Sequence, residues 1–289
     1  MKLVLPEFTE HFASLAPHYD VILCDVWGVV HNSLVSSRPA CDALARFRAQ
    51  GGTVILITNA PRPGAAVVRH LDALDVPPKA YDGIVSSGDV TRSIVAGRPG
   101  ERVFHIGPER DIGIFAELDV RFAREETADY VVCSGLFNDD VETPEHYRAM
   151  LTGIRARDLF MVCANPDLVV ERGTRLIYCA GALADLYHSL GGDVLYAGKP
   201  HRPIYDAALA KAEAARGQAT KLDRVLAIGD SVRTDLKGAS GLGVDCLFVT
   251  AGIHAEELGS RENPDIAALG GIFAEAGIAP KAVTRRLTW

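Results

Sequence analysis

Short apolar runs recur along the chain, and segments with apolar residues at helical spacing separate them. Most runs are apolar at nearly every position, which is typical of strands that a parallel sheet buries on both faces. Segments such as 38–52 and 201–217 have Pro near the start and Gly at the end, which predicts helices. Alternation of strand and helix predicts an α/β protein with right-handed crossovers. The predicted strands cover residues 19–26, 52–59, 81–87, 102–107, 129–135, 158–166, 193–198, 223–230 and 245–250.

Composition narrows the class of protein. The 289 residues suffice for one large or two modest domains, and the net charge of −7 argues against a nucleic-acid-binding surface. No uninterrupted apolar segment approaches ~18 residues, so we expect no membrane partner. The N-terminus lacks the pattern of a secretory signal, so we expect a cytoplasmic protein. The six cysteines form no metal-ligand spacing, which predicts reduced, structural thiols.

Polar side chains follow four of the predicted strands. Ligands of open parallel sheets bind at the carboxyl ends of the strands, so these residues are candidates for chemistry. Carboxylates on neighbouring strands suit a shared Mg²⁺, and hydroxyl, amide and ammonium groups suit phosphate oxygens. The candidates are Asp25, Thr58, Asn59, Lys199, Asp230 and the following Asp235.

Each candidate alone also has a structural interpretation. Asp25 suits a turn or a helix N-cap, and Thr58 and Asn59 could cap a helix that begins near Pro61. Lys199 could be an exposed loop lysine, and Asp235 is expected to cap the helix that follows it. The order of the motifs along the chain favours the functional interpretation.

That order resembles the haloacid dehalogenase (HAD) superfamily, and within it the class IIA branch that includes NagD-like and 4-nitrophenylphosphatase-like hydrolases. The resemblance covers nearly the whole chain. It rests on "DVWGV" (25–29), "ITNAP" (57–61), "AGKP" (197–200), "IGDSVRTDLKGASGLG" (228–243) and the segments "CANPD" (163–167) and "CAGAL" (179–183).

The resemblance implies a Rossmann-like core with a parallel sheet, formed by residues 1–88 and 192–289. Residues 89–191 would form an inserted C2-type α/β cap domain. Asn165 and Asp167 would then lie on the cap near the substrate, although a turn at "NPD" explains them equally well. Related caps often form dimer contacts, so a homodimer through the cap is one option.

The same resemblance implies a Mg²⁺-dependent phosphatase that acts on a small phosphomonoester, such as a sugar phosphate or nucleotide. Asp25 would be the nucleophile and form an aspartyl-phosphate. The metal ligands would be Asp25, the backbone carbonyl of Trp27, Asp230 and, in support, Asp235. The transferring phosphoryl group would be bound by Thr58, Asn59 and Lys199.

The sequence departs from the family pattern at Trp27, where phosphatases of the superfamily carry a second, acid–base Asp. An indole N–H can neither protonate the leaving oxygen nor activate the attacking water. General acid–base catalysis of these steps is worth roughly 10²–10⁴-fold in rate. Three interpretations follow: a phosphatase that is weak or restricted to good leaving groups such as aryl or acyl phosphates, a non-catalytic binding protein for a phosphorylated metabolite, or a dehalogenase. His31 could replace the missing acid–base because a histidine pKa is usually near neutrality, although a loop histidine without a catalytic role is the alternative.

Overall fold

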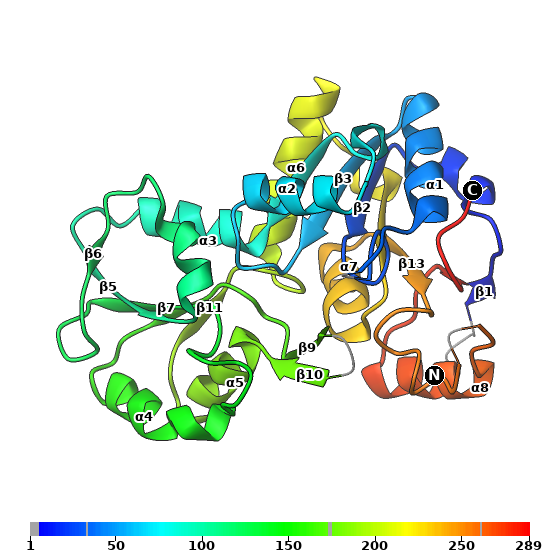
Figure 1. Cartoon of the computed structure of the whole chain (residues 1–289). Helices are drawn as coiled ribbons and strands as arrows, with labels where there is room; N and C mark the ends of the chain where they lie inside the picture. The colour runs from blue at the N-terminus through cyan, green and yellow to red at the C-terminus, as the bar shows by residue number, and fades with distance from the viewer. Residues whose placement is uncertain (1–5, 33, 173–174, 261) are drawn as a thin grey trace. The chain divides into compact units, whose positions relative to one another are not determined.

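The computed structural model describes residues 6–32, 34–172, 175–260 and 262–289. Within these ranges the strands form two parallel sheets and one antiparallel hairpin, and helices alternate with many of the strands along the chain (Figure 1). The predicted α/β fold class is therefore confirmed.

The larger sheet has seven strands among the described residues, in the order β1-β14-β13-β12-β2-β3-β4. Strands β2, β3 and β12 are buried at every position, as the apolar runs predict. The bounds are β1 (Glu7–Phe8), β2 (Val21–Asp25), β3 (Thr53–Thr58), β4 (Gly83–Ser86), β12 (Val225–Gly229), β13 (Asp245–Val249) and β14 (Ala282–Thr284).

The smaller sheet has five strands in the order β11-β8-β7-β5-β6, and a separate hairpin pairs β10 with β9. The bounds are β5 (Arg102–Ile106), β6 (Arg121–Phe122), β7 (Tyr130–Cys133), β8 (Met161–Cys163), β9 (Val169–Arg172), β10 (Arg175–Tyr178) and β11 (Val194–Tyr196).

The α-helices described are α1 (Arg38–Ala49), α2 (Gly64–Ala73), α3 (Ser87–Ala96), α4 (Arg148–Ala156), α5 (Ala180–Ser189), α6 (Arg202–Arg216), α7 (Lys237–Leu242) and α8 (Ile266–Ala276). Shorter 3₁₀ turns are η1 (Phe12–Ser14), η2 (Ala16–His18), η3 (Pro78–Ala80), η4 (Glu109–Phe115), η5 (Pro144–Tyr147) and η6 (Leu222–Arg224), and η7 (Val232–Leu236) is a π-helical turn.

Each of the nine predicted strands is present. Apolar runs mark strands that are buried on both faces, although β5 and β11 are only partly buried. The sequence pattern missed β1, β6 and β14, which are two or three residues long, and the hairpin of β9 and β10. It also placed the start of one helix near Pro61, whereas α2 begins at Gly64.

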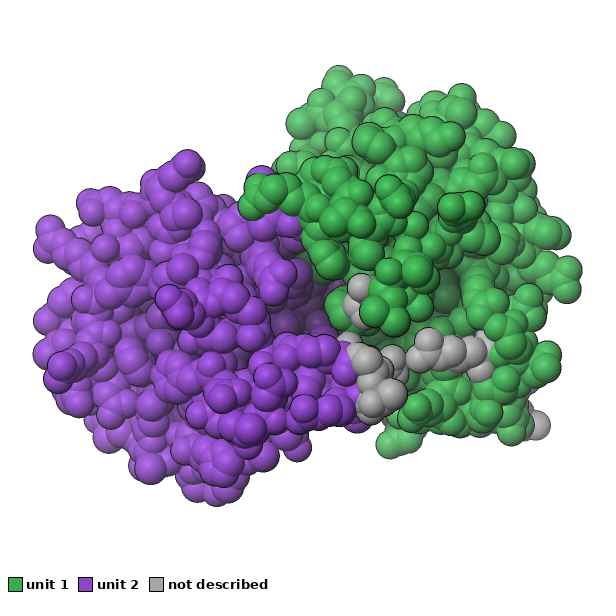
Figure 2. Space-filling view, in the orientation of Figure 1, with its two compact units in different colours: residues 1–58, 68–85, 205–289 green, residues 59–67, 86–204 purple. Residues whose placement is uncertain are grey.

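The chain divides into two compact units, which Figure 2 shows in different colours. The first comprises residues 1–58, 68–85 and 205–289 and the second residues 59–67 and 86–204. Strand β11 pairs with β8, so the five-stranded sheet includes residues just beyond position 191. The proposed core and cap boundaries stay a prediction.

In the second unit, alternate strand residues supply two hydrophobic clusters on opposite faces of the five-stranded sheet. Val131, Cys133, Met161 and Cys163 pack with residues of α4 and α5. The intervening residues Tyr130, Val132, Val162 and Ala164 pack with Val95 of α3 and with Ile114 and Phe115 of η4. Helical segments thus cover both faces, which explains why these strands are apolar throughout.

In the first unit, a further cluster joins β12, β13 and β14 to η7, α7 and α8. Phe248 of β13 and Phe273 of α8 meet edge to face in it, with ring centroids 5.3 Å apart. This packing anchors the turn η7, which carries Asp235.

All six cysteines are buried and free of disulfides, as the sequence predicts. Burial raises the pKa of the Cys133 thiol to about 12, so that thiol stays protonated at neutral pH. Among the described residues, no helix is long and apolar enough to cross a membrane.

Candidate active site

The register of the large sheet brings three candidate residues to one edge. Asp25, the last residue of β2, pairs with Ile57 of β3, so Thr58 lies one residue further along the same edge. On the other side of β2, Cys24 pairs with Ile228 of β12, so Asp230 directly follows the end of that strand. Because parallel strands all end at this edge, residues distant in sequence meet there.

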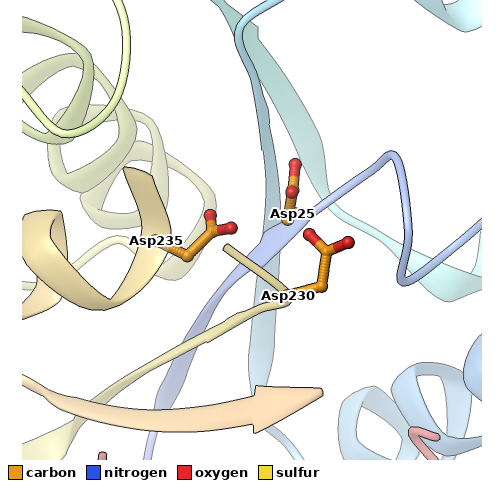
Figure 3. A group of neighbouring side chains, drawn as sticks. All are labelled: Asp25, Asp230 and Asp235. Carbon is orange, nitrogen blue, oxygen red and sulfur yellow. The ribbon is translucent and has the colours of Figure 1, made fainter. Parts of the chain in front are cut away.

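Three carboxylates cluster at this edge. Asp25, Asp230 and Asp235 each offer an oxygen within 4.8 Å of the others, and their exposed fractions are only 7%, 4% and 2%. In Figure 3 the three side chains point into the same space, Asp25 and Asp230 from strand ends and Asp235 from a helical turn. The structure therefore brings together the three acids that the resemblance implied as metal ligands.

Asp235 does not cap a helix, contrary to the structural interpretation of the sequence. The cap of η7 is Ser231, whose hydroxyl accepts a hydrogen bond from the Thr234 N–H at 3.3 Å. Asp235 lies inside the turn, and its Oδ2 accepts from the Ser231 N–H at 3.2 Å. Gly229 is required beside it, because an added Cβ would lie 2.1 Å from the Asp235 carboxyl carbon.

Two loops hold Asp230, one within the motif at 25–29 and one after β13 that no sequence motif marked. The Ile253 N–H donates to Asp230 Oδ2 at 2.7 Å. A Cβ on Gly252 would lie 1.9 Å from that oxygen, and a Cβ on Gly28 would lie 2.1 Å from it. Gly28 also has φ +84°, which favours glycine. A local signal for the second loop is Gly252, which lies two residues beyond the apolar run 245–250.

His254 is a further residue that the sequence did not single out. Its Nε2 accepts from the Val232 N–H at 3.2 Å, and its Nδ1 lies 2.8 Å from Glu257 Oε2. Accepting at Nε2 requires the neutral tautomer with the proton on Nδ1, and Glu257 stabilises that tautomer. His254 thereby supports the turn that carries Asp235.

The expected acid–base position holds an exposed indole. Trp27 is 37% exposed, and its ring lies 5.4 Å from that of His31 at an angle of 64°. His31 is buried and also faces His70, with ring centroids 5.4 Å apart. Burial, reinforced by His70, lowers the pKa of His31 to about 4, so a near-neutral pKa was the wrong expectation.

Asn59, Asp167 and Lys199 meet within the second unit. The Asn59 side chain holds both backbone groups of Lys199: its Oδ1 accepts from the Lys199 N–H at 2.7 Å, and its Nδ2 donates to the Lys199 carbonyl at 3.1 Å. Nδ2 also donates to Asp167 Oδ1 at 2.9 Å. Asn59 is therefore not a helix cap. Lys199 is only 2% exposed, so the interpretation as an exposed loop lysine is wrong.

Asn165 stabilises the turn at "NPD". Its Oδ1 accepts from the Asp167 N–H at 3.1 Å, the hydrogen bond of an Asx turn. Only glycine fits at position 198 beside this turn, because a Cβ there would lie 2.4 Å from Asn59 Oδ1 and 2.7 Å from Pro166 Cδ. The structural interpretation of Asn165 thus holds, and a contact with substrate stays a prediction.

The acid cluster fits a hard divalent cation. Asp25, Asp230 and Asp235 supply oxygen atoms only, which Mg²⁺ prefers. Backbone N–H groups orient each carboxylate, including Asp25, whose Oδ1 accepts from the Val26 N–H at 2.7 Å. Like charges this close and buried repel one another, so a cation among them would relieve a large electrostatic cost.

Comparison with known proteins agrees with this geometry. A family model described as haloacid dehalogenase-like hydrolase matches residues 22–121, and one described as HAD-hydrolase-like matches residues 196–269. The crystal structure of a haloacid dehalogenase-like hydrolase from Brucella suis 1330 is 49% identical, with a TM-score of 0.86 over 97% of this chain and 100% of that chain. The chain belongs to the haloacid dehalogenase-like hydrolases.

The chain is also similar to glycerol phosphate phosphatase of another organism. D-glycerol 3-phosphate phosphatase of Mycobacterium tuberculosis is 28% identical over 252 residues, which are 84% of this chain and 66% of that protein. The chain thus spans about two thirds of the length of this curated relative. A glycerol phosphate phosphatase of the same organism, crystallised with magnesium, has a TM-score of 0.64 and 24% identity over 91% of this chain and 78% of that chain. At 24% identity, the similarity to this crystal structure shows a shared fold alone.

Proposed function

We propose that the chain is a Mg²⁺-dependent phosphatase that releases phosphate from a small phosphomonoester through an aspartyl-phosphate. The observation that carries the proposal is the buried cluster of Asp25, Asp230 and Asp235 at a sheet edge that also holds Thr58. The names of its relatives, a glycerol phosphate phosphatase among them, favour a phosphorylated metabolite as the substrate.

In this proposal Asp25 attacks the phosphorus atom. Its carboxylate oxygen bonds to phosphorus while the ester P–O bond breaks and the electron pair leaves with the ester oxygen. A water oxygen then bonds to phosphorus, the bond to Asp25 breaks, and the carboxylate is restored. One water proton ends on the phosphate and the other on the departed alcohol.

The other candidates take supporting roles. The Thr58 hydroxyl, the Asn59 N–H and the Lys199 ammonium would bind the phosphoryl oxygens and stabilise the charge of the transition state. Mg²⁺ would be held by Asp25, the Trp27 carbonyl and Asp230, with Asp235 in support, and its positive charge would offset repulsion between the substrate and Asp25. The core and cap division, the contacts of Asn165 and Asp167 with substrate, the cap dimer and the cytoplasmic location stay predictions.

Trp27 leaves open a second candidate function, a non-catalytic protein that binds a phosphorylated metabolite. It is favoured by the absence of a proton donor at position 27, while a neutral, buried His31 is a poor general acid. Displacement of halide needs no metal, so the three clustered carboxylates disfavour the dehalogenase.

The first experiment compares the wild type with Asp25→Asn. We expect the substitution to lower Mg²⁺-dependent phosphate release by at least about 10³-fold, because it removes the nucleophile. Phosphate release from 4-nitrophenyl phosphate and a metabolite panel is measured with and without Mg²⁺. Asp42→Asn, an exposed acid paired with Arg46, is the matched control.

Full turnover by Asp25→Asn would contradict the assignment of the nucleophile. No turnover by the wild type, together with Mg²⁺-dependent binding of inorganic phosphate in calorimetry, would favour the binding protein. Halide release from 2-haloacids would favour the dehalogenase instead.

A further inference from the structure

Two exposed apolar side chains lie on the loops that hold Asp230. Trp27 precedes Gly28, and Ile253 follows Gly252; both glycines approach Asp230 Oδ2 so closely that a Cβ would collide with it. The exposed fractions of Trp27 and Ile253 are 37% and 41%, although their loops contact a buried carboxylate. Trp27 and Ile253 thus belong to the loops next to the acid cluster, within the same unit.

The Trp27 indole is held by its surroundings. The Gly28 N–H donates to the His31 carbonyl at 2.8 Å, and the His31 N–H donates to the Val26 carbonyl at 3.1 Å, which closes a tight turn. The His31 ring packs against the indole, and His70 of α2 packs against His31 in turn. An aromatic surface fixed in this way can receive a planar group with little loss of conformational entropy.

The residue type at position 27 also favours a particular leaving group, independently of any apolar contact. An indole N–H donates a hydrogen bond but does not give up its proton, so the ester oxygen must depart as an anion. A phenol has a pKa of about 10, whereas the pKa of water, a guide to that of an aliphatic alcohol, is several units higher. A phenolate therefore leaves far more readily without a proton than an alkoxide does.

We propose that Trp27 and Ile253 are specificity-determining residues that bind an aromatic leaving group and restrict turnover to phosphate monoesters of aromatic alcohols. The inference rests on the proposed phosphatase function. Asp25 bonds to phosphorus, the P–O bond to the aryl oxygen breaks, and the phenolate takes the electron pair. The phenolate gains its proton from solvent. An acyl phosphate would release a carboxylate, which is an even better leaving group, but it would place a polar carbonyl against the apolar side chains, which disfavours it.

A binding experiment tests the apolar surface without catalysis. Phenylphosphonate and methylphosphonate cannot be hydrolysed at their C–P bond, and calorimetry with Mg²⁺ gives their dissociation constants for the wild type. We expect phenylphosphonate to bind about 3–10-fold more tightly, the size of an aromatic contact. Trp27→Leu should remove most of that preference. The control Phe8→Leu changes an exposed aromatic residue of β1 and should keep it.

A turnover experiment tests the restriction. We expect the wild type to hydrolyse phenyl phosphate at least about 10²-fold better than methyl phosphate in kcat/KM, the size of the missing acid–base contribution. Trp27→Asp should narrow this ratio by raising methyl phosphate turnover. Comparable turnover of both esters, or an aryl binding preference that survives in Trp27→Leu, would overturn the inference. Absence of phosphate release from every ester would instead contradict the proposed function.

Discussion

Asp230 imposes glycine at two positions that are more than two hundred residues apart in the chain. A Cβ on Gly28 or Gly252 would enter the space of the same carboxylate oxygen, and the Ile253 N–H already donates to that oxygen. The absence of a Cβ at both positions therefore leaves room for the Asp230 carboxylate in its observed orientation. The geometry of a single residue thus depends on the backbone of two distant loops.

Gly252→Ala should weaken Mg²⁺ binding by about 10–100-fold, the usual effect of disturbing the groups that orient a metal ligand. The added methyl would lie 1.9 Å from Asp230 Oδ2, so the carboxylate or the loop must move. Calorimetric titration with Mg²⁺ measures the change. Gly241→Ala of α7, where a Cβ would have no heavy atom within 4 Å, is the control. Unchanged affinity in Gly252→Ala would show that Asp230 is not a ligand.

At the scale of elements, the loop after β3 and the turn after β8 are linked through side chains. Asn59 connects the turn at Asp167 with the backbone of Lys199 by three hydrogen bonds. Gly198 and the Asx turn of Asn165 allow this close approach. We infer that Asp167 positions Asn59, which in turn fixes the backbone of Lys199.

Asp167→Ala should lower kcat/KM for 4-nitrophenyl phosphate by about 3–10-fold, since it removes one hydrogen bond that orients Asn59. Asp167→Asn keeps an acceptor oxygen and should retain most of the activity. Steady-state kinetics of the two variants separate loss of the acceptor from loss of the charge. An equal loss in both variants would indicate that the negative charge of Asp167 matters instead.

At the scale of the whole molecule, Asp20 joins the starts of three strands of the large sheet, at the edge opposite the acid cluster. Its N–H donates to the Arg224 carbonyl before β12, and its carbonyl accepts from Thr53 of β3. Its carboxylate accepts from Arg224 at 2.7 Å and Arg216 at 3.3 Å. The hydrogen bond from Arg224, with help from Arg216, holds the pKa of this carboxyl below its ordinary value.

Because the pKa of Asp20 is lower in the folded state, its stabilising effect is complete above the unfolded pKa of about 3.9 and is lost as pH falls through the folded pKa. Asp20→Asn should lower the free energy of unfolding at pH 7 by about 0.2–1 kcal/mol, as expected for a partly exposed ion pair. Urea denaturation at a series of pH values from 7 to 3 should show that the difference in free energy of unfolding between wild type and Asp20→Asn becomes smaller as the pH falls. A difference independent of pH would contradict the ionic origin. Asp42→Asn, a solvated helix pair, is the control.

Prediction from sequence succeeded where a residue's role follows from its own strand. Asp25, Thr58 and Asp230 lie at or directly after apolar runs, and the register of parallel strands then brings them to one edge. Prediction failed where a residue's role depends on a partner that is distant in the sequence. The pKa of His31 depends on burial and on His70, and the role of Asn59 depends on a turn more than a hundred residues away.

The sequence by itself determined the α/β class, the buried strands, the family and the acids of the candidate site, because apolar runs and strand-end motifs are local features of the chain. Only the tertiary structure decided that Asp235 lies inside a turn, that Lys199 is buried, and that loops at Gly28 and Gly252 meet at Asp230. Burial, close approach and pKa depend on which distant segments pack together. No short segment of the chain contains that information.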